Sequence, residues 1–160
     1  MLAQQDRLAF SNHLDLYDLI IPQDNLLRRI NMLIDFTFVY KELVSKYSLE
    51  NGRTAESPVR MFKYLLLKTV YDLSDVDVVE RSRYDMSFKY FLGMVPEDDV
   101  IDPSSLCKFR KRRLKDMDLL NLLIEKTVIL AIEKGIIKSA SIIVDATHTG
   151  SRSNPHSPIE

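Results

Sequence analysis

The sequence predicts a mainly α protein: a helical bundle with helix-turn-helix-like segments, followed by one stub β-strand. Apolar residues recur at three- and four-residue steps through most of the chain, the spacing that places them on one face of a helix. Glycine and proline are scarce, at four and six of 160 residues, which favours long regular elements over loops. The helical period stops at residues 141–145, SIIVD, a β-branched run typical of a buried strand.

The first third of the chain is expected to contain an arm and a broken helix. Residues 12–22 alternate loosely between polar and apolar and end at Pro22, which favours an extended arm. Residues 24–47 carry two apolar stripes, so we expect a helix that is interrupted near Asp35. The pair Asn51-Gly52 then indicates a turn.

The next helix has the clearest start signal. Ser57 suits an N-cap, and Pro58 suits the first helical position, where its missing N–H costs nothing. The apolar residues that follow form one expected buried face: Phe62, Leu65, Leu66, Val70 and Leu73. We therefore expect a helix with one continuous buried face.

Ser74 is expected to cap a short polar helix at about 75–84, in which Val76 and Val79 point inward. Together with the preceding helix it permits a helix-turn-helix, a motif that places its second helix in the major groove. Its basic end, Arg81 and Arg83, is the weaker candidate for DNA contact, because its acidic start repels phosphate. Further helical turns are expected to end at Gly93.

The last helices frame a strongly basic segment. Asp102 and Pro103 repeat the cap-then-proline start, and a helix is expected to run to about Met117. A more apolar helix follows over about 118–134 and ends at Gly135. After the predicted strand, the polar residues 146–160 are typical of a loop.

Composition excludes several classes of protein. The net charge of −1 argues against a generally basic coat, although acidic residues at 97–102 are followed directly by a basic run. The one cysteine, Cys107, excludes an internal disulfide and a cysteine-rich zinc site. No apolar run approaches the roughly 18–20 residues of a bilayer span, and the N-terminus lacks the pattern of a secretory signal. We therefore expect a cytoplasmic protein without a membrane partner.

Four basic side chains of the 103–117 helix fall on the face opposite its apolar residues: Lys108, Lys111, Arg112 and Lys115. We call these four residues the basic strip. Such a strip can follow a DNA backbone, because each neutralised phosphate releases counterions. The alternative is a solvated face, the usual fate of a run of charges, and composition alone leaves both interpretations open.

Arg110 and Arg113 depart from this pattern, since they fall on the side of the apolar residues Leu106 and Phe109. A charge there is costly unless it is paired. We expect these arginines to reach solvent along their stems or to pair with an internal carboxylate. Alternatively they border a cleft shared with the catalytic domain or with nucleic acid, so Arg110 is also a candidate DNA contact.

Asp145 is the candidate catalytic and metal-binding residue. A carboxylate at the end of an apolar strand stands where open or mixed sheets build active sites. Phosphodiester chemistry commonly uses two magnesium ions held by several carboxylates, and one aspartate cannot hold them. On residue pattern alone, an aspartate that simply ends a strand at a turn is the simpler interpretation. His148 is expected to be a polar loop residue rather than a ligand.

Five blocks of sequence stand in a distinctive order. They are IPQDNLLRRIN (21–31), YSLENGRTAESPVRMFKYLLLK (47–68), FLGM (91–94), IDPSSLCKFRKRR (101–113) and IIVDATHT (142–149). This order resembles the InsH-like N-terminal region of bacterial insertion-sequence DDE transposases. The resemblance covers roughly residues 14–155, and its specificity comes from the order of the blocks, since no single block is diagnostic.

The resemblance implies a role for each part of the chain. Residues 1–50 would form an N-terminal arm and helices, and residues 51–135 a helical domain that binds the terminal inverted repeats of the element. Residues 139–160 would be the first strand and following loop of an incomplete ribonuclease-H-like catalytic domain. In this resemblance the helix that carries Ser104, Ser105, Phe109 and Arg110 precedes the catalytic core.

Asp145 would then be the first carboxylate of a DDE triad that holds Mg²⁺ or Mn²⁺ in the complete enzyme. Because the other two carboxylates are missing, we expect a truncated chain that neither cuts DNA nor binds a metal tightly by itself. Its expected partners are double-stranded DNA of the transposon ends, and a second copy or a separately encoded catalytic half. The predicted strand could alternatively pair with residues 14–21.

Two other functions stay open at this stage. One is a stand-alone DNA-binding regulator or repressor that derives from a transposase. The other is a helical protein-interaction module that does not bind DNA.

Overall fold

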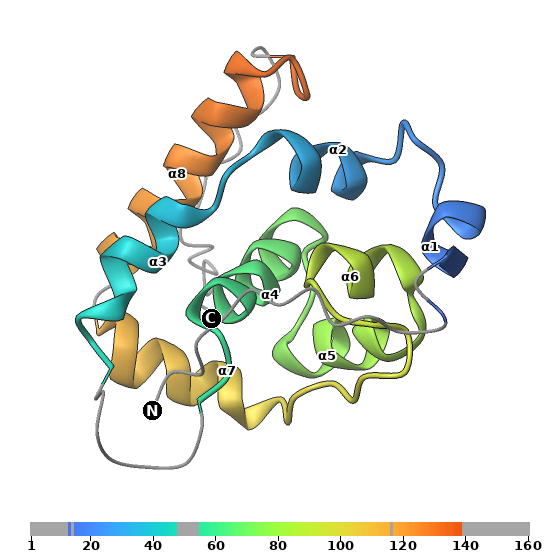
Figure 1. Cartoon of the computed structure of the whole chain (residues 1–160). Helices are drawn as coiled ribbons and strands as arrows, with labels where there is room; N and C mark the ends of the chain where they lie inside the picture. Colours follow the sequence, from blue (N-terminus) through green and yellow to red (C-terminus); the bar gives the residue numbers. More distant parts are fainter. Residues whose placement is uncertain (1–12, 14, 48–54, 116, 139–160) are drawn as a thin grey trace, which may run out of the picture.

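The computed structural model describes residues 13, 15–47, 55–115 and 117–138. In these ranges the elements are α1 (Asp15–Ile20), α2 (Leu26–Leu33), α3 (Thr37–Val44), α4 (Pro58–Val70), α5 (Asp75–Tyr84), α6 (Met86–Phe91), α7 (Ser104–Phe109), the π-helical turn η1 (Arg110–Leu114) and α8 (Met117–Glu133). The mainly α prediction is confirmed for this part of the chain (Figure 1). The predicted strand at 141–145 lies outside the described residues.

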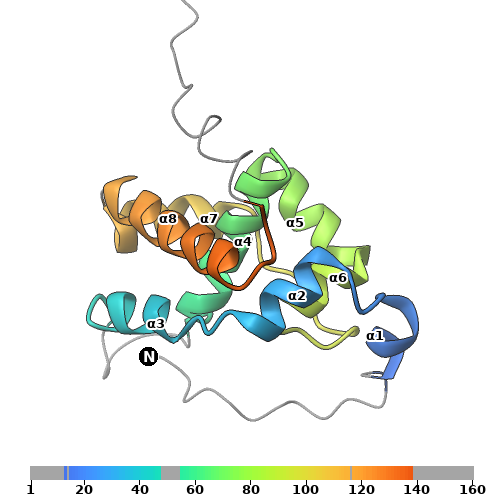
Figure 2. The same ribbon diagram turned by 90° about the horizontal axis from the view of Figure 1, so that it is seen from above.

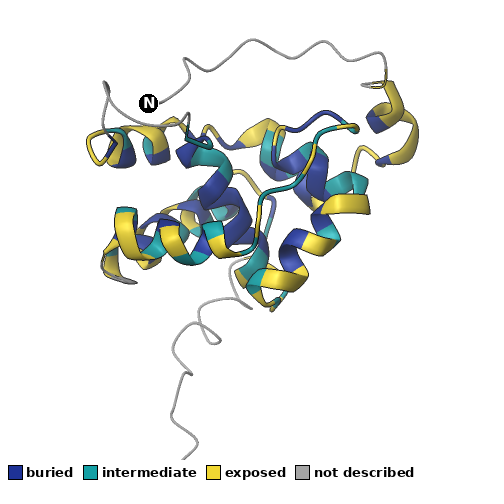
Figure 3. Ribbon diagram, turned by 90° about the horizontal axis from the view of Figure 1, so that it is seen from below, coloured by how far each residue is buried: buried dark blue, intermediate teal, exposed yellow. Residues whose placement is uncertain are grey.

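Helix α4 is the centre of the fold, with α3, α5 and α7 packed around it (Figures 1 and 2). Ser57 caps it as predicted, since its Oγ accepts a hydrogen bond from the Arg60 amide at 3.4 Å, and Pro58 occupies the first turn. Residues 61–67 are all buried, so this stretch is enclosed on every side rather than along one stripe (Figure 3). The predicted face extends too far at its end, because Val70 is exposed.

The predicted breaks between helices are confirmed where the structure describes them. Chain direction changes at Asp35, whose carboxylate accepts a hydrogen bond from the Thr37 amide at 2.9 Å and starts α3. Ser74 starts α5 in the same way, at 3.0 Å from the amide of Asp77. Gly93 and Gly135 follow α6 and α8 with φ of 67° and 68°, the left-handed backbone that ends a helix at low cost for glycine.

The extended arm predicted for residues 12–22 is wrong, because residues 15–20 form helix α1. Tyr17 anchors this turn: it is 4% exposed, and its hydroxyl donates to the Met94 carbonyl at 2.6 Å. Arg28 of α2 donates to the carbonyls of Tyr17 and Ile21 at 3.2 and 3.0 Å, which satisfies the end of a helix too short to persist alone. The alternative in which residues 14–21 pair with a strand is therefore also wrong.

The inward face of α5 differs from the prediction by a small rotation. Val79 is fully buried as expected, but Val76 is 57% exposed and Val78 is buried in its place. Residues 78, 79 and 82 share one side of a helix, and the buried Ser82 completes that side by donating to the Val78 carbonyl at 2.6 Å. In the first turn of α5, Val76 and Asp77 are therefore exposed.

Lys63 of α4 is a buried cation inside the bundle. Its Nζ lies 2.6 Å from the Asn31 side-chain oxygen, and 4.8 and 4.9 Å from the ring centres of Phe36 and Phe91. Burial lowers its pKa from 10.5 to about 8, and the charge of Arg60 acts in the same direction. The charge is held by one amide oxygen and two ring faces, so it fixes α2, α3 and α6 against α4.

This lowered pKa predicts a rise in stability with pH. Between about pH 8 and 10 the unfolded chain holds more protons at Lys63 than the folded chain, so the free energy of unfolding increases as pH rises. We expect a gain on the order of 2 kcal/mol in urea unfolding followed by circular dichroism. Lys63→Met should remove this gain, whereas Lys41→Met, at an exposed position of α3, should keep it. Equal pH slopes in the wild type and Lys63→Met would contradict the assignment.

Candidate nucleic-acid interface

The basic segment is built from two kinds of helical turn. Helix α7 starts after Asp102, whose carboxylate accepts a hydrogen bond from the Ser104 amide at 2.8 Å. At Arg110 the α pattern gives way to η1, where the Lys115 amide donates to the Arg110 carbonyl at 3.0 Å, a bond across five residues. Lys115 then has a φ of 45°, and α8 begins at Met117. The helix predicted to run to about Met117 is therefore confirmed from Ser104 to Leu114, but it ends three residues early and its last turn is π-helical.

The π turn has a physical reason in the positions of the apolar residues. In an α-helix five residues turn by about 500°, which would place Leu114 roughly 140° away from Phe109. The wider turn brings residues five apart toward one side, and both side chains are buried, at 3% and 5% exposure. A π turn therefore keeps Leu114 in the core, and such turns are frequent at functional sites.

All four residues of the basic strip are exposed on the outer face of α7, η1 and the following residue: Lys108, Lys111, Arg112 and Lys115. Within the described part of the chain, none of the four forms a hydrogen bond or an ion pair through its side chain. The predicted exposure of the strip is confirmed. Among the described residues, therefore, no hydrogen-bonding or ion-pairing partner holds these four side chains.

Arg110 has a different role from the strip, because its guanidinium is paired inside the fold. Its Nη1 and Nη2 donate to the two carboxylate oxygens of Asp75 at 2.9 and 2.5 Å. Lys68 of α4 also contacts Asp75, at 2.8 Å. The hydrogen bonds from Arg110, and then those from Lys68, lower the pKa of Asp75 to about 2. The expected internal carboxylate partner of Arg110 is thus found, 35 residues away in sequence.

Arg113 is also held, but without a carboxylate. Its Nη1 donates to the carbonyl of Lys46, and its guanidinium lies 4.1 Å from the ring centre of Tyr47. These contacts tie η1 to the residues that follow α3. The basic tip of α5 is engaged as well, since Arg81 pairs with Asp85 at 3.0 Å and Arg83 with Glu80 at 3.2 Å.

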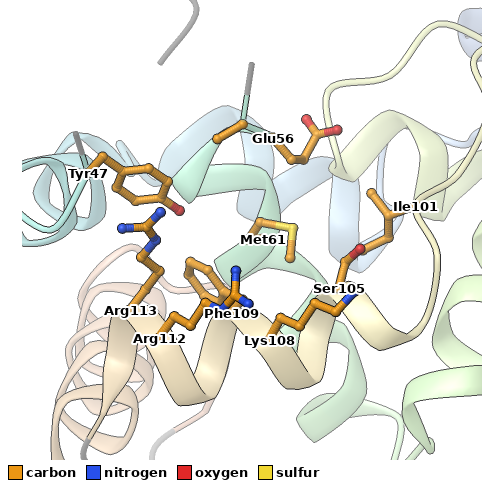
Figure 4. A pocket seen from close by; sticks show the side chains of 10 residues that line it. Tyr47, Glu56, Met61, Ile101, Ser105, Lys108, Phe109, Arg112 and Arg113 are labelled. Carbon is orange, nitrogen blue, oxygen red and sulfur yellow. The ribbon is translucent and has the colours of Figure 1, made fainter. Parts of the chain in front are cut away.

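A pocket of about 210 Å³ opens beside the strip, between α7 with η1 and the residues that precede α4. The side chains from α7 and η1 lie on one side, and Tyr47 and Glu56 lie across from them (Figure 4). Lys108, Arg112 and Arg113 contribute its positive charge. Sequence analysis missed this pocket, because it forms only where three segments far apart in the chain meet.

The predicted catalytic residue Asp145 and its neighbour His148 lie outside the described residues. Among the residues that are described, no group of three or more histidine, cysteine, aspartate or glutamate side chains is arranged to hold a metal ion. Nor does any helix in this part of the chain combine the length and apolar content that crossing a membrane requires.

The pairing of Arg110 leads to a stability prediction. Asp75→Asn should lower the free energy of unfolding by about 2 kcal/mol, because a half-buried guanidinium loses its charged partner. Since the folded pKa of Asp75 is depressed, the wild type should lose the same contribution as pH falls from about 4 to 2. Thermal unfolding at pH 7 and pH 2.5 measures both effects.

Glu80→Gln is the matched control for this prediction, since Glu80 pairs with Arg83 at 3.2 Å on the exposed side of the same helix. Its effect should stay within about 0.5 kcal/mol. A loss for Asp75→Asn no larger than that of the control would show that the buried pair does not stabilise the fold.

The geometry can be set beside known proteins. Residues 15–112 match the sequence profile of a family described as Transposase domain (DUF772), a span from α1 into η1. Neither the curated proteins nor the solved structures contain a match to the chain. The profile covers more than half of the 160 residues. It supports the resemblance to transposases as a class. The chain belongs to the DUF772 family of transposase domains.

Proposed function

We propose that this chain binds double-stranded DNA at the terminal inverted repeats of an insertion sequence, as the N-terminal helical portion of an InsH-like DDE transposase. One observation carries the proposal: four exposed cations, without ion-pair partners in the described residues, follow one segment of a transposase domain. Lysine and arginine in such a row neutralise successive phosphates. Contacts of this kind position a protein on the duplex, whereas base contacts specify the sequence.

The support beneath the strip favours this function. Arg110 is anchored on Asp75 at 2.5 and 2.9 Å, and Arg113 is anchored on Tyr47 and the Lys46 carbonyl, so both neighbours of the strip are fixed from inside. A fixed backbone reduces the ordering cost of binding. In the proposal Arg110 is thus a positioning residue, and DNA contact is assigned to Lys108, Lys111, Arg112 and Lys115.

For the complete enzyme, we propose Asp145 as one carboxylate ligand of Mg²⁺ or Mn²⁺. The ion would lower the pKa of the attacking water or hydroxyl and stabilise the leaving oxygen. The DNA-binding proposal does not depend on this assignment. The DNA-binding proposal is tested separately, by measuring the binding of short duplexes in the absence of divalent metal.

The proposal predicts a change in the salt dependence of DNA binding. A variant with alanine at all four strip positions should bind DNA more weakly. The slope of the logarithm of its binding constant against the logarithm of the salt concentration should be less negative by about three to four, roughly one for each lost phosphate contact. A charge-matched control replaces Lys41, Lys126, Lys134 and Lys138 with alanine, four exposed lysines on α3, α8 and just after it. Fluorescence anisotropy titrations at salt concentrations from about 50 to about 300 mM measure both slopes.

The outcomes separate the alternative functions. Equal slopes for the strip variant and the control would remove the strip as the DNA contact. No binding to any duplex would favour a helical protein-interaction module. Binding with no preference for the ends of the element over random duplex would contradict the part of the proposal that concerns inverted repeats.

A further inference from the structure

We propose that the pocket beside the basic strip receives one unpaired nucleotide at an end of the bound DNA, with the base inside the pocket and its phosphate at Lys108 and Arg112. This inference rests on the proposed function and deepens it, because it names the form of DNA end that the domain prefers.

The interior of the pocket suits the flat, apolar body of a base. Three otherwise buried side chains line it with their exposed edges, and Ile101 adds a further apolar wall. These three are Tyr47, Met61 and Phe109, which are 9%, 4% and 5% exposed. Its volume of about 210 Å³ provides space on the scale of one aromatic base rather than of a stacked pair. The Arg113 guanidinium already lies 4.1 Å from the centre of the Tyr47 ring, so a base in the pocket would contact the aromatic rings at their exposed edges.

The charges around the opening favour an anion. Lys108, Arg112 and Arg113 all line the pocket, and the acidic side chain among the lining residues is Glu56. Glu56 is already neutralised by Arg60, at 2.9 Å. A nucleotide carries an apolar ring and a negative phosphate on one small body, so it matches both the interior and the rim.

Continuity with the strip indicates that the nucleotide belongs to DNA and is not a free metabolite. Lys108 and Arg112 line the pocket and are also members of the strip, which continues along the same segment to Lys111 and Lys115. A backbone that follows the strip would therefore deliver its terminal nucleotide to the opening. A paired base cannot enter, because it is held by its pairing partner and by the bases stacked on it. An unpaired terminal base has no pairing partner, so little free energy is needed to move it into the pocket.

The test compares a blunt duplex with duplexes that carry a single 2-aminopurine overhang on the 5′ or the 3′ strand. The wild type should bind one overhang duplex about tenfold more tightly than the blunt duplex, the scale of one base–aromatic contact. The fluorescence of 2-aminopurine, an adenine analogue that is quenched by stacking, should fall on binding. Two separate variants, Ser105→Leu and Ala55→Leu, add bulk at two lining residues that are not members of the strip.

Both filled variants should bind the blunt duplex with the wild-type salt slope but lose the overhang preference and the quenching. Equal binding of blunt and overhang duplexes by the wild type would overturn the inference and leave the proposed function standing. Retention of the preference by both filled, folded variants would also overturn it, since the unpaired base would then bind elsewhere. Absence of binding to every duplex would instead overturn the proposed function.

Discussion

The carboxylate of Asp75 is the point on which the arrangement of the basic segment depends. Asp75 is the first residue of α5, and its carboxylate accepts hydrogen bonds from both terminal nitrogens of Arg110 and forms an ion pair with Lys68. One aspartate therefore joins η1, α5 and α4. Arg110 could not sit on the inner side of its helix without such a partner, because an unpaired guanidinium loses its hydration there. Once Arg110 is fixed, the residues on the opposite side of the segment are directed outward. The inner ion pair and the buried Leu106, Phe109 and Leu114 thus lie opposite the basic strip.

Much of the helical framework could be predicted from local signals. Ser57, Ser74 and Asp35 have side chains that satisfy exposed amides at helix starts, and these signals depend only on residues two or three positions away. Two failures have a common origin. Helix α1 depends on Arg28 and on the Met94 carbonyl, and the π turn depends on where Leu114 finds its core. Both are fixed by tertiary contacts, which override local patterns.

The candidate site was accessible from sequence only in part. The strip follows from helical spacing, and the cost of an inward charge predicts a partner for Arg110, yet nothing local identifies Asp75 among many carboxylates. The pocket could not be predicted, because Tyr47 and Met61 have the same pattern as ordinary core residues. Their remaining exposed edges become a surface where the segment after α3 meets α4 and α7. Local sequence therefore identifies charges and faces, whereas cavities require the assembled fold.

The net charge of the chain does not show which of its cations are already engaged within the fold. The chain has 22 lysines and arginines against 23 acids, which by itself suggests no affinity for phosphate. Several cations are committed to the fold: Lys89 donates to the carbonyls of Pro96 and Asp98 at 2.5 and 2.7 Å, and Lys63 is held by an amide and two rings. Such cations offer an external phosphate little, because binding it would first break an existing contact. Those of the strip have no such contact in the described structure, so the DNA of the proposed function would not have to break one in order to reach them.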